Sequence, residues 1–336
     1  MTDRATVVES VQIGQETTPG TAVACPTTLR SMSLDIKIAG DDDVFRPDGH
    51  KFNAVVVPGM EWSTFSLTGK PTYTEICYVL EALLGHVSPS VPSGGTLTNL
   101  RVYDYADTAV ATPKTLTIMK GSAVRAEKLA YGLVTDLGFG FSRKNGLTLT
   151  GAGIGQQFTD GITMTASPTD VPLIPVAGKQ IDVFLDSTAA GLGTTKLLRA
   201  FAIEPGVTGA YGPIWPLNSS NASFGAAVDL ALGTACKIQL ESDAAGMAQL
   251  TQYRSGDLIF LRTLATGPVI EVVAGTPPVN LTYLLQIDLA LGVNKAPSPG
   301  NDVDGVTVVE YDCEFVRDST WGKAMEIQVQ NALASL

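Results

Sequence analysis

The chain has 336 residues, more than a single hydrophobic core usually holds, and a formal net charge of −11 with only 16% charged residues. The acidic balance excludes a protein that grips nucleic acid through its phosphates, because such binding needs clustered lysine and arginine. The 34 glycines and 19 prolines favour short strands joined by tight turns, so we expect a mainly β fold of two domains.

Residues 1–27 are rich in threonine and glycine and offer few apolar side chains to a core. We expect them to form an N-terminal arm that stays loose or docks on a neighbouring subunit. Deleting residues 2–20 should then leave the rest of the chain folded.

The first regular element is a strand that returns later in the chain. In L-R-S-M-S-L-D-I, residues 29–36, apolar Met32 and Leu34 alternate with polar residues, which is typical of a half-buried strand. The segment L-R-A-F-A-I-E, residues 198–204, has the same type and phase, with Phe201 in the place of Met32. We expect these two side chains to occupy equivalent core positions.

Further segments recur in the same order. The matched pairs are 65–67 with 238–240, 138–143 with 312–317, and 147–150 with 325–328. The recurrence predicts a duplicated chain, and the proline-rich stretch between the copies predicts an extended linker. The expected parts are a first domain at 28–164, a linker at 165–180 and a second domain at 181–336. An immunoglobulin-like second half is the alternative.

Each copy should carry a flanking helix. Residues 71–85 form an apolar stripe that excludes Glu75 and Glu81, with a proline near the start and Gly85 where a helix ends. The stripe consists of Tyr73, Ile76, Cys77, Leu80 and Leu84. The counterpart, residues 242–253, contains Gly246 and should be shorter or frayed.

Residues with catalytic or metal-binding chemistry form no recognised pattern. The acidic loop at 39–51 lacks the alternate oxygen ligands and closing glutamate of a calcium loop, and only His50 and His86 could serve a triad or zinc centre. G-A-G-I-G at 151–155 lacks the dinucleotide-binding spacing and is interpreted as a flexible strand end. We predict no catalytic, cofactor-binding or metal-binding residues, and therefore no enzyme.

The cysteines and the apolar segments indicate in which cellular compartment the protein is expected. The four cysteines include no C-x-x-C pair, so we expect reduced structural thiols in a cytosolic product. The most apolar segment, 282–293, is broken by Gln286 and Asp288. We expect neither a secretory signal nor a membrane span.

Several longer stretches resemble the major tail tube proteins of long-tailed (siphovirus-type) bacteriophages. The similar stretches are Q-E-T-T-P-G-T-A-V (15–23), the F-R-P-D-G loop, S-L-T-G-K-P with its helix ending A-L-L-G (66–85), L-G-F-G-F-S-R-K-N-G-L-T-L-T-G-A-G-I-G (137–155), T-K-L-L-R-A-F-A-I-E-P (195–205), Y-G-P-I-W-P-L-N (211–218), and D-G-V-T-V-V-E-Y followed by A-M-E-I-Q-V-Q-N near the end.

The resemblance implies two tandem tail-tube-type β-sandwich or barrel domains. In this family, strands of neighbouring subunits join edge to edge around a channel, and stacked rings form the tube through which the genome passes. Rings commonly contain six units, so a duplicated chain implies a homotrimeric, pseudo-hexameric ring, with a true hexamer as the alternative.

The implied setting is the virion tail, assembled in the cytoplasm of the host bacterium. Implied partners are other copies of the chain, the tape measure protein, and the tail terminator and distal tail proteins. DNA would be passing cargo, so the channel wall should be neutral to acidic.

Two loops are the expected contacts between rings. In the first copy the candidates are Asp41, Asp42, Asp43, Phe45, Arg46 and Asp48. In the second copy they lie at 211–223 and include Tyr211 and Trp215. The rival function is a secreted or surface β-rich binding or adhesin module. Such a module would favour a secretion signal and clustered exposed aromatic residues, whereas the three tryptophans are scattered.

Overall fold

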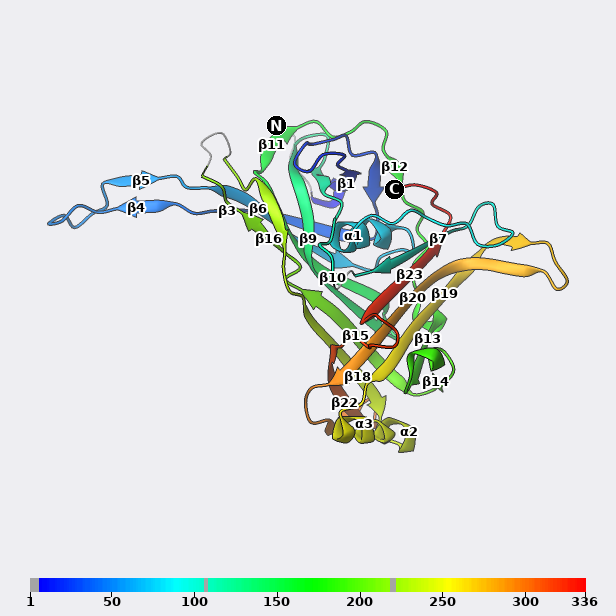
Figure 1. Ribbon diagram of the computed structural model, residues 1–336. Coiled ribbons are helices and arrows are strands. Elements are labelled where there is room, and N and C mark those ends of the chain that lie inside the picture. The colour runs from blue at the N-terminus through cyan, green and yellow to red at the C-terminus, as the bar shows by residue number, and fades with distance from the viewer. Residues whose placement is uncertain (1–5, 106–107, 218–221) are drawn as a thin grey trace.

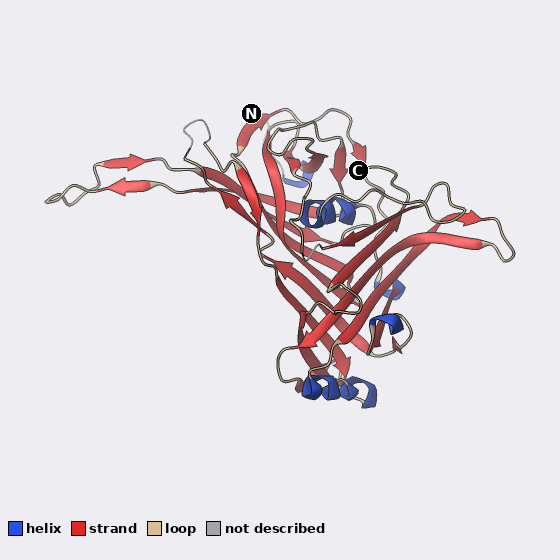
Figure 2. Cartoon of the chain, viewed as in Figure 1, coloured by secondary structure: helices blue, strands red, loops and turns tan. Residues whose placement is uncertain are grey.

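The computed structural model describes residues 6–105, 108–217 and 222–336. Strands hold 52% of the residues and helices 9%, which confirms the prediction of a mainly β protein. Nineteen strands form one large mixed sheet that folds into layers (Figures 1 and 2).

The first layer contains eight antiparallel strands drawn from both halves of the chain. In spatial order they are β3 (Met32–Gly40), β6 (Glu61–Gly69), β10 (Gly146–Gly155), β9 (Ala126–Ser142), β15 (Ala200–Thr208), β18 (Gly233–Glu241), β22 (Val306–Phe315) and β21 (Ser298–Val303). The halves meet where Ile203 of β15 pairs with Phe141 of β9.

The second layer packs across the core from the first. Its strands, in order, are β14 (Lys196–Leu197), β13 (Ile181–Asp186), β19 (Ile259–Val273), β20 (Val279–Val293), β23 (Met325–Asn331) and β7 (Asn99–Asp104). The last residues of β20 pair with the end of β22, so the two layers are continuous at one end.

A smaller group of strands covers the opposite end. It contains β12 (Thr169–Asp170), β2 (Thr27–Leu29), β1 (Ser10–Gln15), β8 (Leu116–Gly121), the first half of β9 and β11 (Thr159–Ile162). Strand β9 serves both sheets because it bends at Tyr131, whose φ is 55°. The remaining short elements are η1 (Thr6–Val8), η2 (Gly178–Gln180) and η3 (Ala189–Gly191).

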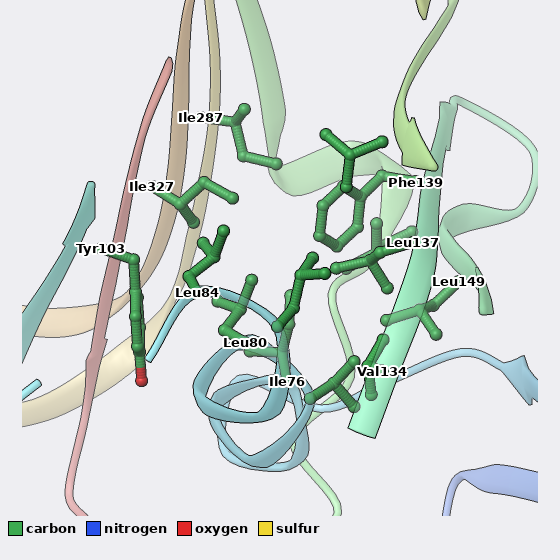
Figure 3. Packing of buried hydrophobic residues seen from close by; sticks show 14 of the residues in the cluster. Ile76, Leu80, Leu84, Tyr103, Val134, Leu137, Phe139, Leu149, Ile287 and Ile327 are labelled. Carbon is green, nitrogen blue, oxygen red and sulfur yellow. The ribbon is translucent and has the colours of Figure 1, made fainter. Parts of the chain in front are cut away.

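The predicted first helix is confirmed as α1 (Glu75–Leu84), and it lies between the layers. Its side chains meet Val134, Phe139 and neighbours on one side and Ile287 and Ile327 on the other (Figure 3). All ten residues are buried. The prediction that Glu75 and Glu81 lie off the buried stripe is therefore wrong, because the helix is enclosed on every side.

Each buried glutamate has polar partners that compensate for the loss of water. Glu75 accepts the backbone N–H groups of Arg30 at 2.6 Å, Ser31 at 3.0 Å and Thr72 at 3.1 Å. Because Arg30 and Ser31 immediately precede β3, this carboxylate fixes the first strand of the layer to the start of the helix.

The second glutamate connects the other end of α1. Glu81 accepts a hydrogen bond from the Gln15 side-chain amide at 2.7 Å and lies 2.9 Å from the His86 Nδ1. The Arg101 Nε lies 4.0 Å from its other oxygen. The helix end is thus held to β1 in the smaller group and to β7 of the second layer.

The second helical segment is divided into α2 (Ala244–Ala248) and α3 (Leu250–Ser255), as the prediction of a shorter helix requires. A Cβ on Gly246 would lie 2.0 Å from the Glu241 carbonyl oxygen, so the close approach of α2 to β18 requires glycine here. The Tyr311 hydroxyl donates to the Gly246 carbonyl at 2.7 Å.

Segment 151–155 is a paired part of β10 rather than a flexible strand end. A Cβ on Gly153 would lie 2.2 Å from the Phe65 ring. These glycines therefore let neighbouring side chains cross the strand closely.

The chain between the halves also belongs to the core. Within 165–180, Val171 and Val176 are 3% and 4% exposed, and β12 pairs with β2. One hydrophobic cluster includes residues from both halves, so they are not separate bodies.

Two of the four recurring matches coincide with equivalent strands. β3 pairs with β6 as β15 pairs with β18. The later matches are wrong, because β22 pairs with β18 in the place that β10 takes beside β6. Phe201 is only half-buried at a bulge in β15, whereas Met32 is 5% exposed, so these two do not occupy equivalent core positions.

The prediction of a loose arm is wrong for β1. This strand pairs with both β2 and β8, and its Ile13 is 2% exposed. Just beyond it, Glu16 accepts hydrogen bonds from the Thr117 hydroxyl and the Tyr131 N–H, each at 2.9 Å. Residues 1–5 lie outside the described part.

Deleting residues 2–20 should therefore destabilise the chain, because it removes a paired strand. A sharper test is Ile13→Ala, which should lower the free energy of unfolding by about 2–4 kcal/mol through a buried cavity. Val7→Ala, at a side chain that is 89% exposed, is the matched control. Urea unfolding followed by circular dichroism measures both, and equal midpoints for the two variants would contradict the assignment.

Candidate functional site

A long hairpin projects from the first layer, and none of the described residues covers it. It contains β4 (Asp43–Phe45) and β5 (Val55–Val57) and stands far from the body (Figure 1). Every residue from 41 to 60 is exposed, including Phe52 at 84% and Val56 at 62%. A two-stranded ribbon is marginally stable alone in water, so these apolar side chains favour a partner.

The six predicted contact residues of the first copy all lie on this hairpin or at its base. They are Asp41, Asp42, Asp43, Phe45, Arg46 and Asp48, and all are exposed. One has a structural role as well, since the Asp42 carboxylate accepts the Gly59 N–H at 3.1 Å.

The second-copy hairpin, by contrast, lies against its own chain. It contains β16 (Tyr211–Ile214) and β17 (Ala226–Asp229). Tyr211 is 5% exposed, and its hydroxyl donates to the Leu83 carbonyl at the end of α1, at 2.5 Å. The Trp215 ring lies 5.3 Å from that of Trp62. Both predicted contact residues therefore pack on the first half, while 218–221 of the predicted loop lie outside the described residues.

Three further contacts seat this internal hairpin. The Ala227 N–H donates to the Tyr131 hydroxyl at 3.1 Å, and the Tyr105 hydroxyl donates to Asp229 at 2.8 Å. The Ala210 N–H donates to the Thr135 carbonyl at 3.0 Å, just where β15 leaves β9. The first half thus provides a strand, a helix end and a loop as the seat.

The two hairpins are built alike. Phe45 lies opposite Val55 in one, and Ile214 lies opposite Ala226 in the other. In each, the N–H just before the second strand donates to the carbonyl of the last residue of the first strand, at 2.9 and 3.1 Å. They differ in what surrounds them, one being seated and the other exposed.

The first layer ends in two strands that are each paired on one side. Within the described residues, β3 pairs only with β6, and β21 pairs only with β22. Ile38 on β3 is 58% exposed, and five of the six residues of β21 are exposed. Unpaired edges of this kind are templates for a further strand.

The face of the first layer turned away from α1 is polar and composed of small residues. Cross-strand neighbours there include Thr68 with Thr150, Thr150 with Gly138, and Gly138 with Gly206. None of these four is buried, whereas the alternating residues between them face the core. The result is a smooth surface across strands from both halves.

Carboxylates outnumber amines on this face. The charged residues of the strands include Asp35, Lys37, Asp136, Glu204, Lys237, Glu241, Glu310 and Asp312. Lys120, Arg199 and Lys295 lie within 4 Å of Asp35, Glu241 and Asp312 respectively. The Lys237 Nζ lies 3.0 Å from Glu310, and this contact lowers the pKa of the Glu310 carboxyl. The face therefore keeps only a small excess of negative charge, which does not attract the phosphates of DNA.

A second projection, the far part of β19–β20, is held by one carboxylate that the sequence did not reveal. Glu271 accepts the N–H groups of Thr96, Leu97 and Thr98 at 2.8–3.0 Å. The Thr98 side chain, followed by the N–H groups of Thr96 and Leu97, lowers the pKa of Glu271 to about 2. The two groups are over 170 positions apart, so no local pattern could reveal the contact.

A cleft of about 760 Å³ lies between the β9–β10 turn, β13, β14 and the start of β15. Two ion pairs line it, Lys196 with Asp182 at 2.7 Å and Arg199 with Glu241 at 2.5 Å. These charged groups neutralise one another, so the cleft does not present them to a ligand.

The four cysteines are free and buried, and burial raises the pKa of Cys25 to about 12. These thiols are therefore poor nucleophiles. In the described part of the chain, no group of three or more His, Cys, Asp or Glu side chains is placed to hold a metal ion.

Glu271→Gln should loosen the loop at 90–98, because a neutral amide accepts weaker hydrogen bonds from the three N–H groups. The expected result is faster hydrogen–deuterium exchange in this loop, with β9 unchanged. Wild-type protein should show the same loosening as the pH falls below about 4.5 towards 2, because the depressed pKa stabilises the contact only while the carboxylate is charged. Glu204→Gln is the control, and equal exchange in both variants would contradict the role of Glu271.

None of the described helices is both long and apolar enough to cross a membrane.

Within the described residues, the candidate functional surfaces are the free edges of β3 and β21, the β4–β5 hairpin and the polar face of the first layer. Comparison with protein-family models and with curated proteins finds none that matches this chain.

Proposed function

We propose that this chain is a structural subunit of a phage-type tail tube, forming stacked rings around a channel for genome passage. One observation carries the proposal. The pairing of β9 with β15 joins two four-stranded units side by side, β3–β6–β10–β9 and β15–β18–β22–β21, and leaves β3 and β21 with one free edge each.

The two units are proposed to be tandem tube-type repeats. Each begins with a strand pair interrupted by a hairpin of the same register, continues with a helical segment, and returns a strand to the second member of the pair. The tight turns also correspond, since Gly146 is the first residue of β10 and Gly305 immediately precedes β22, both with positive φ. This recurrence supports duplication over an immunoglobulin-like second half.

The ring would close through the free edges. If β21 of one chain takes β3 of the next, the new junction repeats the β9–β15 junction inside each chain. Closure removes every exposed edge of the first layer. Three chains supply six units, so a homotrimeric ring is the proposal and a hexamer the alternative.

The polar face of the first layer would line the channel. Its small residues leave a smooth wall, and its excess of carboxylates prevents DNA from adhering. The opposite face is committed to α1 and the second layer, so only the polar face is free for this role.

The wider setting follows from the resemblance to tail tube proteins. The tube would form in the host bacterial cytoplasm and become part of the virion tail. The tape measure protein would occupy the channel during assembly, and the terminator and distal tail proteins would bind the two ends. DNA would be transient cargo.

Ring closure is tested by replacing residues 298–303 with a glycine–serine segment of equal length. Wild-type protein should show rings or tubes with threefold symmetry in negative-stain images, and the variant should remain monomeric because it lacks the β21 edge. The same replacement at 159–162, in β11 outside the first layer, should leave assembly intact. Isolated wild-type particles that bind glycans would instead favour the adhesin function.

The channel assignment is tested by adding positive charge to the polar face. Assembled tubes of Thr68→Arg/Thr150→Arg should retain short double-stranded DNA in a sedimentation assay, with binding lost as salt rises. Wild-type tubes and tubes of Thr194→Arg, an exposed position off this face, should retain none. Equal DNA retention by the two arginine variants would place the channel elsewhere.

A further inference from the structure

The exposed β4–β5 hairpin has an equivalent that is already seated. Hairpin β16–β17 belongs to the second unit and packs on the first unit, across the β9–β15 junction. If a second junction of the same kind joins two chains, the first-unit hairpin of one chain lies beside the second unit of its neighbour. The contacts of β16–β17 with the first unit then serve as a template for the contacts of β4–β5 with the neighbouring chain.

The seat on the second unit can be located from equivalent elements. The Tyr211 hydroxyl donates to the carbonyl of Leu83, two residues before Gly85, which caps α1. The corresponding helix α3 is capped by Gly256, and the residue two positions before this glycine is Arg254. The position equivalent to Tyr211 on the exposed hairpin is Asp42, three residues before the matched end of the strand at Phe45.

The residues at these two places are complementary. Asp42 is exposed and acidic, with Asp41 and Asp43 beside it, and Arg254 is exposed in the last turn of α3. The internal pair of a tyrosine hydroxyl and a carbonyl would become an aspartate and an arginine, a charge-assisted contact. Tyr253, next to Arg254, is 37% exposed and offers apolar surface to the hairpin valines.

A second part of the seat corresponds to Thr135, where the internal hairpin leaves the sheet. Asp136 pairs with Ala152 on β10, and its equivalent Ser298 pairs with Glu310 on β22. The segment 294–298 therefore takes the place of residues around Thr135. Its residues are mostly exposed, including Lys295, so this segment is open to a neighbouring chain.

We propose that the β4–β5 hairpin of one chain docks on the second unit of the neighbouring chain in the same ring, against the end of α3 and segment 294–298. The proposal rests on the proposed tube function and names the partner surface for the hairpin. It differs from the expectation that this loop bridges successive rings. Docking would cover the exposed valines and phenylalanines that the monomer leaves in water.

The test is disulfide cross-linking of the full chain carrying Asp42→Cys and Arg254→Cys. The native cysteines are all buried, so they do not compete. Oxidation of assembled protein should shift the band on a non-reducing gel from 35.2 kDa to three times that mass, because the hairpin of each chain reaches the next around the ring. The matched control combines Asp42→Cys with Leu198→Cys, a side chain that is 87% exposed away from the seat, and should stay monomeric.

Microscopy of the same samples separates the two ideas. Tubes without cross-linking, or equal cross-linking in the control, overturn the docking and leave the tube function standing. Cross-linked trimers without any tube support the docking and overturn the tube function. If the protein forms neither rings nor cross-links, both the docking and the tube function are overturned.

Discussion

Backbone pairing between β9 and β15 is the constraint on which the rest of this structure depends. It converts two four-stranded units into one eight-stranded layer, although the strands belong to different halves of the chain. Because backbone groups make the contact, it does not depend on one particular side chain. A junction of this kind can be repeated between chains wherever equivalent edges are free.

Helix α1 holds that layer to the second one. It is buried on all sides, and fully burying each of its large apolar side chains contributes roughly 1.5–3 kcal/mol. Its two glutamates are anchors rather than surface charges, since Glu75 holds the entry to β3 and Glu81 holds β1. Removing one partner of such a buried group costs more than the contact itself contributes, so the helix fixes the register of the surrounding strands.

The contrast between the two hairpins connects fold to function. Hairpins of the same register occur twice, and the one with a neighbouring unit inside the chain packs on that unit and buries Tyr211, while the one without is exposed along its whole length. The exposed valines and phenylalanines are thus explained as apolar surface that a neighbouring chain would cover. The two free strand edges have the same explanation, which is why a closed assembly accounts for both features together.

By itself the sequence determined the β class, helix α1 and the shorter second helical segment, because local periodicity and glycine placement decide these. It wrongly predicted that Glu75 and Glu81 lie off the buried face of the helix, that the segment of β1 is a loose arm, and that the later repeat matches are equivalent strands. Their surroundings come from residues far away in the chain: Glu81 is buried by Gln15 and Arg101, and β22 takes its place beside β18 through backbone pairing that no side-chain pattern encodes. Only the tertiary structure could decide which alternating face meets the core and which edges stay free, because those depend on what the rest of the chain covers.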